Sequence, residues 1–186
     1  MKAQVIRHRF TVDEYAKMAE AGVLGPERRV ELIDGEIVEM AAMGVDHAGC
    51  ITRANDLFSS RLQGRILVRI QCPILLDEFW APEPDVVLAR RQADFYASAH
   101  PTPPDVLLAI EVSDTTQEYD RETKIPRYGA AGIQESWIAN LASGLLEVYR
   151  SPGKRGYRKV QKFGRTQVVH PLAFPDFEFK VSELLG

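Results

Sequence analysis

Three carboxylates of this chain stand where they could support metal chemistry. Glu31 lies in the run RRVELIDGEIVEM, Asp85 follows a proline, and Glu111 lies near the end of the apolar run VLLAIEV. A carboxylate among apolar neighbours is costly unless a cation or hydrogen bonds satisfy it. Two or three such groups meeting at one sheet edge would form a hard oxygen site suited to Mg²⁺ or Mn²⁺. Such a site predicts metal-assisted attack on a phosphoryl group.

Lys124 is the candidate cation beside these acids, in the first turns of a helix expected to follow Glu111. A lysine there would orient a water and balance a developing anion. Each residue also has an ordinary interpretation. Lys124 could be a solvated helix lysine paired with Asp120, and Asp85 could cap a strand after its proline. Glu111 could form a strand-end salt bridge, and Glu31 could be exposed.

Three polar residues are candidate accessory groups. His47 either begins a predicted helix or lies near the site, Gln71 lies on a strand that could approach the site, and Asp120 could be only an N-cap. Four other residues are expected to pack as buried apolar groups: Tyr128, Trp137, Cys50 and Cys72.

The first part of the chain predicts a helix, a hairpin and a second helix. Residues 11–22 read as a helix, with Thr11 as N-cap and Glu14 as its capping-box partner. Asp34-Gly35 between alternating apolar residues predicts a hairpin. Apolar residues recur at a helical period over 47–62.

The remainder predicts mainly strands around one further helix. Residues 65–76 read as a strand with a bend at Pro73, and 106–112 as a strand buried on both faces. We expect a helix over 120–131, closed by Gly132. Further strands are expected at 86–88, 135–141, 144–151, 156–163 and 166–171, before a short helix at 181–185. This pattern predicts a single domain, residues 1–186, of α/β (α+β) class: a mixed central β-sheet flanked by α-helices.

Composition excludes several classes of protein. Two cysteines among 186 residues exclude a disulfide scaffold and a Cys-rich zinc site. No apolar run approaches the roughly 20 residues that span a bilayer, so we expect no membrane partner. The first residues lack the apolar core of a signal peptide, which predicts a cytoplasmic protein. The net charge of −3 argues weakly against nucleic-acid binding.

The distribution of charge is more informative than its sum. The segment from Asp77 to Glu122 contains eleven acidic and three basic residues, whereas the segment from Arg150 to Arg165 contains seven basic residues and no acidic one. The basic window reads as a hairpin that turns at 151–156. It is either a solvated edge that blocks strand pairing or a surface that contacts phosphates.

The ordered motifs resemble the Uma-two family of predicted endonucleases, a branch of the PD-(D/E)XK restriction-endonuclease-like superfamily. The matching pieces are FTVDEYAKM, RVELIDGEIVEM, His47, QCPILL, PEPDVVL, LLAIEVSDTT, YDRETKIPRYGAAGI and ESWIANL. The resemblance covers most of the chain. It implies a restriction-endonuclease-like core with a mixed sheet of four or five strands and the metal at a fork between strands.

The resemblance also implies roles. Asp85 and Glu111 would hold the metal, with the backbone carbonyl of Val112 as a third ligand and Glu31 as an additional acid. Lys124 would be the catalytic lysine, because the superfamily's usual lysine position is Ser113 here.

Together these expectations describe a Mg²⁺- or Mn²⁺-dependent endonuclease that cuts DNA and pairs as a homodimer. The alternative is a catalytically idle nucleic-acid-binding or regulatory module that retained the fold.

Overall fold

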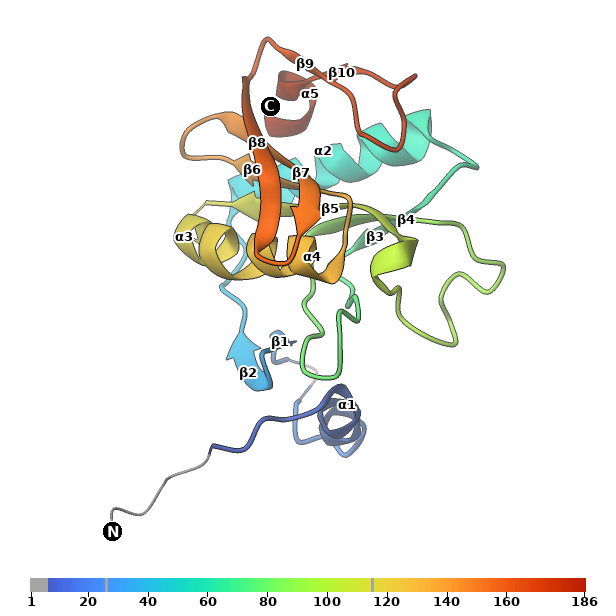
Figure 1. Cartoon of the computed structure of the whole chain (residues 1–186), viewed down its shortest axis with the longest axis vertical. Coiled ribbons are helices and arrows are strands. Elements are labelled where there is room, and N and C mark those ends of the chain that lie inside the picture. Colours follow the sequence, from blue (N-terminus) through green and yellow to red (C-terminus); the bar gives the residue numbers. More distant parts are fainter. Residues whose placement is uncertain (1–6, 26, 115) are drawn as a thin grey trace.

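A mixed β-sheet forms the centre of the molecule (Figure 1). The structure, a computed structural model, describes residues 7–25, 27–114 and 116–186. Within these residues six strands lie in the order β3-β4-β5-β6-β7-β8, and all neighbours are antiparallel except the parallel pair β5–β6. The strands are β3 (Leu67–Ile70), β4 (Val86–Ala89), β5 (Val106–Ser113), β6 (Glu135–Asn140), β7 (Leu145–Gly153) and β8 (Gly156–Gly164). The sheet has six strands rather than four or five because the basic hairpin β7–β8 extends it at one edge.

Helices cover both faces of this sheet (Figure 1). On one face, α2 (Val45–Arg61) and α5 (Val181–Leu185) pack over side chains such as Leu108 and Ile110. On the other face, α4 (Ile125–Ala131) packs over Ala109 and its neighbours. Because side chains alternate along a strand, Glu111 shares the face of Ala109 and therefore lies toward α4.

The parallel pairing of β5 with β6 requires a crossover, and this crossover carries the lysine. It consists of the short helical turn α3 (Gln117–Tyr119), the π-helical turn η2 (Asp120–Lys124) and α4, which ends at Gly132 with φ of 96°. The predicted helix over 120–131 is therefore present but starts earlier and contains a wider turn. Pro126 is the second residue of α4, directly after the π-helical turn.

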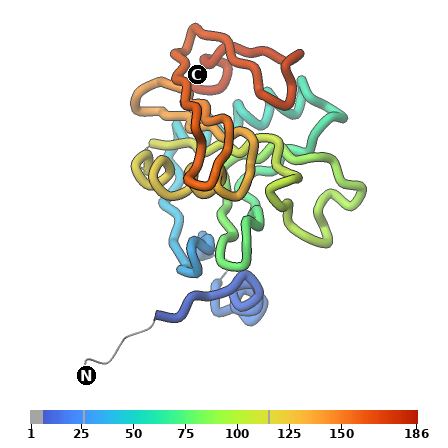
Figure 2. Tube along the Cα trace, in the orientation of Figure 1, coloured from blue at the N-terminus to red at the C-terminus, as the bar shows by residue number. Residues whose placement is uncertain are grey.

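The N-terminal part forms a separate hairpin below the main sheet (Figure 2). Strands β1 (Val30–Ile33) and β2 (Glu36–Glu39) turn at Asp34-Gly35, whose φ values are 52° and 77°. Positive φ at both positions is the type I′ geometry that the Asp-Gly pair favours. The predicted helix is α1 (Val12–Glu20), with the Thr11–Glu14 capping box in place.

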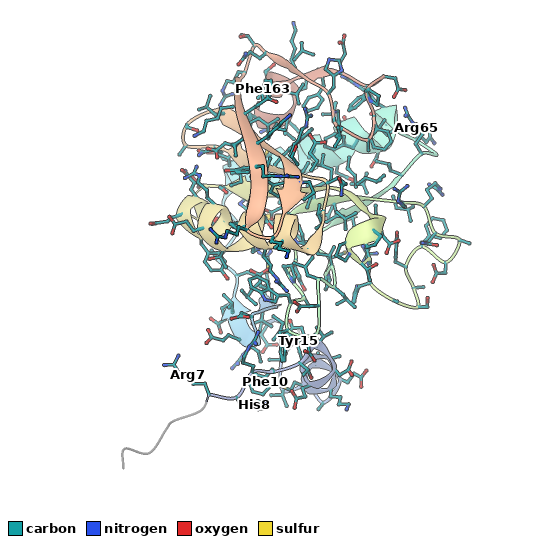
Figure 3. All side chains as sticks on the ribbon, in the orientation of Figure 1. Arg7, His8, Phe10, Tyr15, Arg65 and Phe163 are labelled. Carbon is teal, nitrogen blue, oxygen red and sulfur yellow. The ribbon has the colours of Figure 1, made fainter. Side chains whose placement is uncertain are left out.

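Contacts fix α1 against the hairpin and the hairpin against the sheet. The Tyr15 hydroxyl, labelled in Figure 3, donates to the backbone carbonyl of Val30 at 2.8 Å. Leu32 forms an isolated antiparallel bridge with Ala81, in the segment that leads into β4.

Small elements complete the chain. They are the 3₁₀ turn η1 (Pro103–Asp105) and the two-stranded sheet of β9 (Val168–Val169) and β10 (Phe179–Lys180). Among the described helices, none is both long enough and apolar enough to cross a membrane.

Candidate active site

Asp85 is buried at the start of β4 and accepts hydrogen bonds from three directions. Its Oδ2 accepts the backbone N–H of Val112 at 2.8 Å, and its Oδ1 accepts the Gln71 side-chain amide at 3.1 Å. His47 Nε2 lies 3.0 Å from the same Oδ1. Burial raises the pKa of Asp85, but the hydrogen bonds from His47, Val112 and Gln71 outweigh it and lower that pKa below its usual value. Asp85 is therefore held as a carboxylate.

His47 belongs to this site and does not cap its helix. It lies in the first turn of α2, whose N-cap is Gly44, and its ring reaches Asp85. The hydrogen bond to Asp85 raises the pKa of His47, against the opposing effect of burial.

Gln71 reaches Asp85 from a backbone conformation that side chains rarely adopt. Strand β3 ends at Ile70, and Gln71 has a φ of 47°. This left-handed conformation is strained for a residue with a Cβ. At this residue the chain leaves strand β3, and the side-chain amide contacts Asp85.

Glu111 and Lys124 meet on the α4 face of the sheet. The Lys124 ammonium lies 3.6 Å from Glu111 Oε2, and the Tyr128 hydroxyl donates to Glu111 Oε1 at 2.5 Å. Burial raises the pKa of Glu111 well above its usual value, although Lys124 opposes the shift. Burial lowers the pKa of Lys124, but the surrounding carboxylates outweigh it, so the net pKa is raised and Lys124 keeps its proton.

Glu31 joins this cluster from the N-terminal hairpin and is almost fully buried. Its Oε2 lies 3.0 Å from Lys124 Nζ and accepts the backbone N–H of Glu83 at 3.0 Å. Burial and the charge of Glu31 raise the pKa of the Glu83 side chain to about 7. Glu31 is thus not an exposed strand residue, and Lys124 is paired with Glu31 and Glu111 rather than with Asp120.

Asp120 ties the end of β5 to the crossover. Its Oδ2 accepts hydrogen bonds from Ser113 Oγ at 2.6 Å and from Thr116 Oγ1 at 2.8 Å. Burial raises the pKa of Asp120. Because Asp120 and Lys124 begin and end the π-helical turn, the wider turn helps to bring both into the site, and such turns are frequent at functional sites.

A cavity of about 370 Å³ opens between these elements. It is lined by all the candidate residues of the sequence analysis: Glu31, His47, Gln71, Asp85, Glu111, Val112, Asp120 and Lys124. Among the described residues, none of the seven bases between Arg150 and Arg165 lines it. The candidate residues therefore share one cavity, and the basic window lies outside its lining.

Sequence reasoning missed several parts of the site. Tyr128 was expected only to pack, yet its buried hydroxyl donates to Glu111; its position four residues after Lys124, on the same helix face, was the available signal. Arg29, Tyr119 and the segment 40–44 also line the cavity. Cys72, expected to be buried, is only partly so, whereas Cys50 and Trp137 are buried.

The donor chemistry of the site fits a hard divalent cation. Asp85 Oδ2 accepts one hydrogen bond, and the Oε2 of Glu111 has Lys124 at 3.6 Å as its neighbour, so both oxygens retain acceptor capacity. Within the described ranges, no three His, Cys, Asp or Glu side chains gather as a group that could hold a metal ion. Lys124 lies against both Glu31 and Glu111.

The family model described as "Uma2: Putative restriction endonuclease" matches residues 12–182. The chain belongs to the Uma2 family. Its structure is similar to the crystal structure of "a putative nuclease belonging to DUF820" from Anabaena variabilis ATCC 29413, with a TM-score of 0.72. The two are 15% identical, and the match covers 95% of this chain and 97% of that chain. No curated protein matches the chain.

Uma2 membership confirms the resemblance predicted from the motifs, and the mixed sheet flanked by helices confirms the predicted fold class. At 15% identity the solved structure shows a shared fold only. Family and fold together indicate a nuclease of the restriction-endonuclease-like class, and such a nuclease implies a nucleic-acid substrate.

Proposed function

We propose that this Uma2 protein is a divalent-metal-dependent endonuclease that hydrolyses phosphodiester bonds of DNA. The observation that carries the proposal is that the buried carboxylates of Asp85 and Glu111 line one cavity together with Lys124. Buried carboxylates with one neighbouring ammonium are the arrangement that a bound cation would stabilise.

Asp85 and Glu111 would hold Mg²⁺ or Mn²⁺, with the Val112 carbonyl and Glu31 as supporting oxygens. The metal would supply an activated water and charge stabilisation at the phosphoryl oxygens. His47, Gln71 and the Val112 N–H fix the orientation of Asp85, and Tyr128 fixes that of Glu111. Outer contacts of this kind tune a metal site.

Lys124 acts in this proposal as a fixed positive charge. Its raised pKa keeps the ammonium protonated, so it does not accept a proton from water. It balances negative charge that develops on the phosphate and orients the water by donation. Asp120 positions the crossover that carries Lys124.

The test combines cleavage with metal binding. Wild-type protein and the variants Asp85→Asn and Glu111→Gln are incubated with single- and double-stranded DNA in Mg²⁺ or Mn²⁺, and Mn²⁺ binding is followed by calorimetry. Asp176→Asn, which alters an exposed carboxylate paired with Arg65, is the matched control. We expect both site variants to lose cleavage and Mn²⁺ binding while the control retains them.

Two outcomes contradict the proposal. If wild type cuts no faster than Asp85→Asn on any DNA, the protein is the idle nucleic-acid-binding or regulatory module. If Mn²⁺ binding is the same in Asp85→Asn, the metal site is elsewhere. The predicted homodimer is a separate question, answered by the mass in solution.

A further inference from the structure

One wall of the cavity is apolar, in contrast to its acidic floor. The segment 40–44, with the sequence MAAMG, links β2 to α2 and has no regular secondary structure. All five of these residues line the cavity, and the segment carries no charged residue. Met43 is 40% exposed, and the adjoining Val45 is 90% exposed. An apolar wall beside a few polar groups is typical of a site for an organic ligand.

The cavity has a volume of about 370 Å³. This volume falls in the range of pockets that hold small organic molecules, roughly 300–1,000 Å³.

Tyr119 brings an aromatic ring and a polar group to the same cavity. Its hydroxyl is buried and has no hydrogen-bond partner in the described part of the chain. Burial and the charge of Glu31 raise its pKa to about 12, so the hydroxyl keeps its proton and can donate. An aromatic ring and methionine thioethers that line one cavity favour a flat, polarisable partner.

Arg29 adds a cation to the cavity. It lines the cavity, and among the described residues its guanidinium makes no hydrogen bond or ion pair. Guanidinium groups bind phosphate oxygens through paired hydrogen bonds. The cavity thus offers acidic oxygens for a metal-bound phosphate, a cation for a further phosphate, and an apolar wall for a flat ring.

We propose that the apolar wall formed by residues 40–44 and Tyr119 receives the base of an unpaired nucleotide, so that the substrate is single-stranded or locally unpaired nucleic acid. The inference rests on the proposed nuclease function and adds the substrate class. A base inside a duplex is stacked and paired, and removing it costs a few kcal/mol. An unpaired nucleotide enters the cavity without that cost.

The experiment measures binding apart from cleavage. A short fluorescein-labelled oligothymidylate and a duplex of the same length are titrated with protein, once in EDTA and once in Mn²⁺, and anisotropy is recorded. Cleavage of the same two probes in Mn²⁺ is measured in parallel. The variants are Met43→Ser and Tyr119→Ala, with Leu172→Ser as the control, because Leu172 is an exposed apolar residue, 52% exposed, outside the cavity.

We expect the single strand to bind about 10-fold more tightly than the duplex. Met43→Ser and Tyr119→Ala should each weaken that binding about 5- to 10-fold, within the range of one stacking contact, and Leu172→Ser should not. Thermal melting checks that each variant is folded; Met43 is exposed, so its variant should melt like wild type.

The outcomes separate the two proposals. Equal affinity for both probes, or equal effects of Met43→Ser and Leu172→Ser, overturns the base-binding inference even if DNA is cut. Selective single-strand binding that depends on Met43, without any cleavage, supports base binding and contradicts the nuclease function.

Discussion

The ammonium group of Lys124 lies between two carboxylates from distant parts of the chain, 3.0 Å from Glu31 Oε2 and 3.6 Å from Glu111 Oε2. One residue therefore joins the N-terminal hairpin, the central strand β5 and the crossover. The same contact places a positive charge beside a proposed metal ligand.

Lys124→Met should separate the contribution of Lys124 to cleavage from its effects on metal binding and on stability. We expect cleavage to fall about 100-fold or more, whereas Mn²⁺ should bind more tightly because a competing cation has gone. In EDTA the free energy of unfolding should fall by about 3–5 kcal/mol, since two buried carboxylates lose their partner. Calorimetry and urea unfolding provide the measurements, and Lys124→Arg, which keeps the charge, is the control. Weaker Mn²⁺ binding in Lys124→Met would show that the lysine supports the metal site by positioning alone.

Tyr128→Phe should test the orientation of Glu111. Loss of the hydroxyl removes the donor to Glu111 Oε1. The free energy of unfolding in EDTA should therefore be about 1–3 kcal/mol lower than in wild type. Mn²⁺ affinity should fall about 10-fold, as for other supporting contacts. Tyr157→Phe is the control, because its hydroxyl bonds Ser136 rather than a carboxylate. Unchanged Mn²⁺ affinity in Tyr128→Phe would mean that the hydroxyl has no part in metal binding.

Glu147→Gln should weaken the contact between strand β7 and the π-helical turn of the crossover. Glu147 on β7 is buried and accepts from Arg121 of the π-helical turn at 2.8 Å and from Tyr149 at 2.6 Å. Burial raises the pKa of Glu147, but the hydrogen bonds from Arg121 and Tyr149 outweigh it and lower the pKa overall. Its contribution is therefore present above the unfolded-state pKa and is lost as the pH falls through the lower folded-state value.

We expect Glu147→Gln to lower the free energy of unfolding by about 1–3 kcal/mol at neutral pH. The difference from wild type should shrink as the pH falls below about 4.3. Denaturant unfolding across this pH range measures it. A difference that is constant with pH would refute the ionised contact.

Gly129→Ala should disturb the contact between α4 and the basic hairpin. A Cβ at position 129 would lie 2.7 Å from the Gly156 carbonyl carbon and 2.9 Å from its Cα. Backbone cannot move aside cheaply, so we expect a loss of about 1–3 kcal/mol despite the better helix propensity of alanine. Gly164→Ala, whose Cβ would meet only the Gln167 side chain at 3.7 Å, is the thermal-melting control. Equal melting temperatures for the two variants would contradict the close approach.

Local signals made much of this arrangement predictable. Asp34-Gly35 predicted the turn between β1 and β2, and Thr11 with Glu14 predicted the start of α1. The apolar run around Glu111 predicted β5 as a strand buried on both faces. These features depend on neighbours in the sequence. Glu111 could be predicted as a site residue because a charge in an apolar strand requires a partner, whereas Arg29, Tyr119 and residues 40–44 carried no such signal.

What could not be predicted depends on tertiary contacts. Nothing near Lys124 in sequence indicates that Glu31 will be its partner, and nothing near residue 120 indicates a π-helical turn. The sheet has six strands rather than four or five because strand β7 of the basic hairpin pairs with β6. This pairing is set by packing at the edge of the sheet.

The backbone of Gln71 has a consequence for how this protein could change over time. Its φ of 47° would suit glycine, and a glycine there would relieve roughly 1 kcal/mol of strain while removing the amide that contacts Asp85. Stability and the proposed activity therefore favour different residues at this position. In family members that no longer cleave nucleic acid, we expect glycine to replace the residue at this position. The identity of residue 71 therefore distinguishes active members of the family from inactive ones.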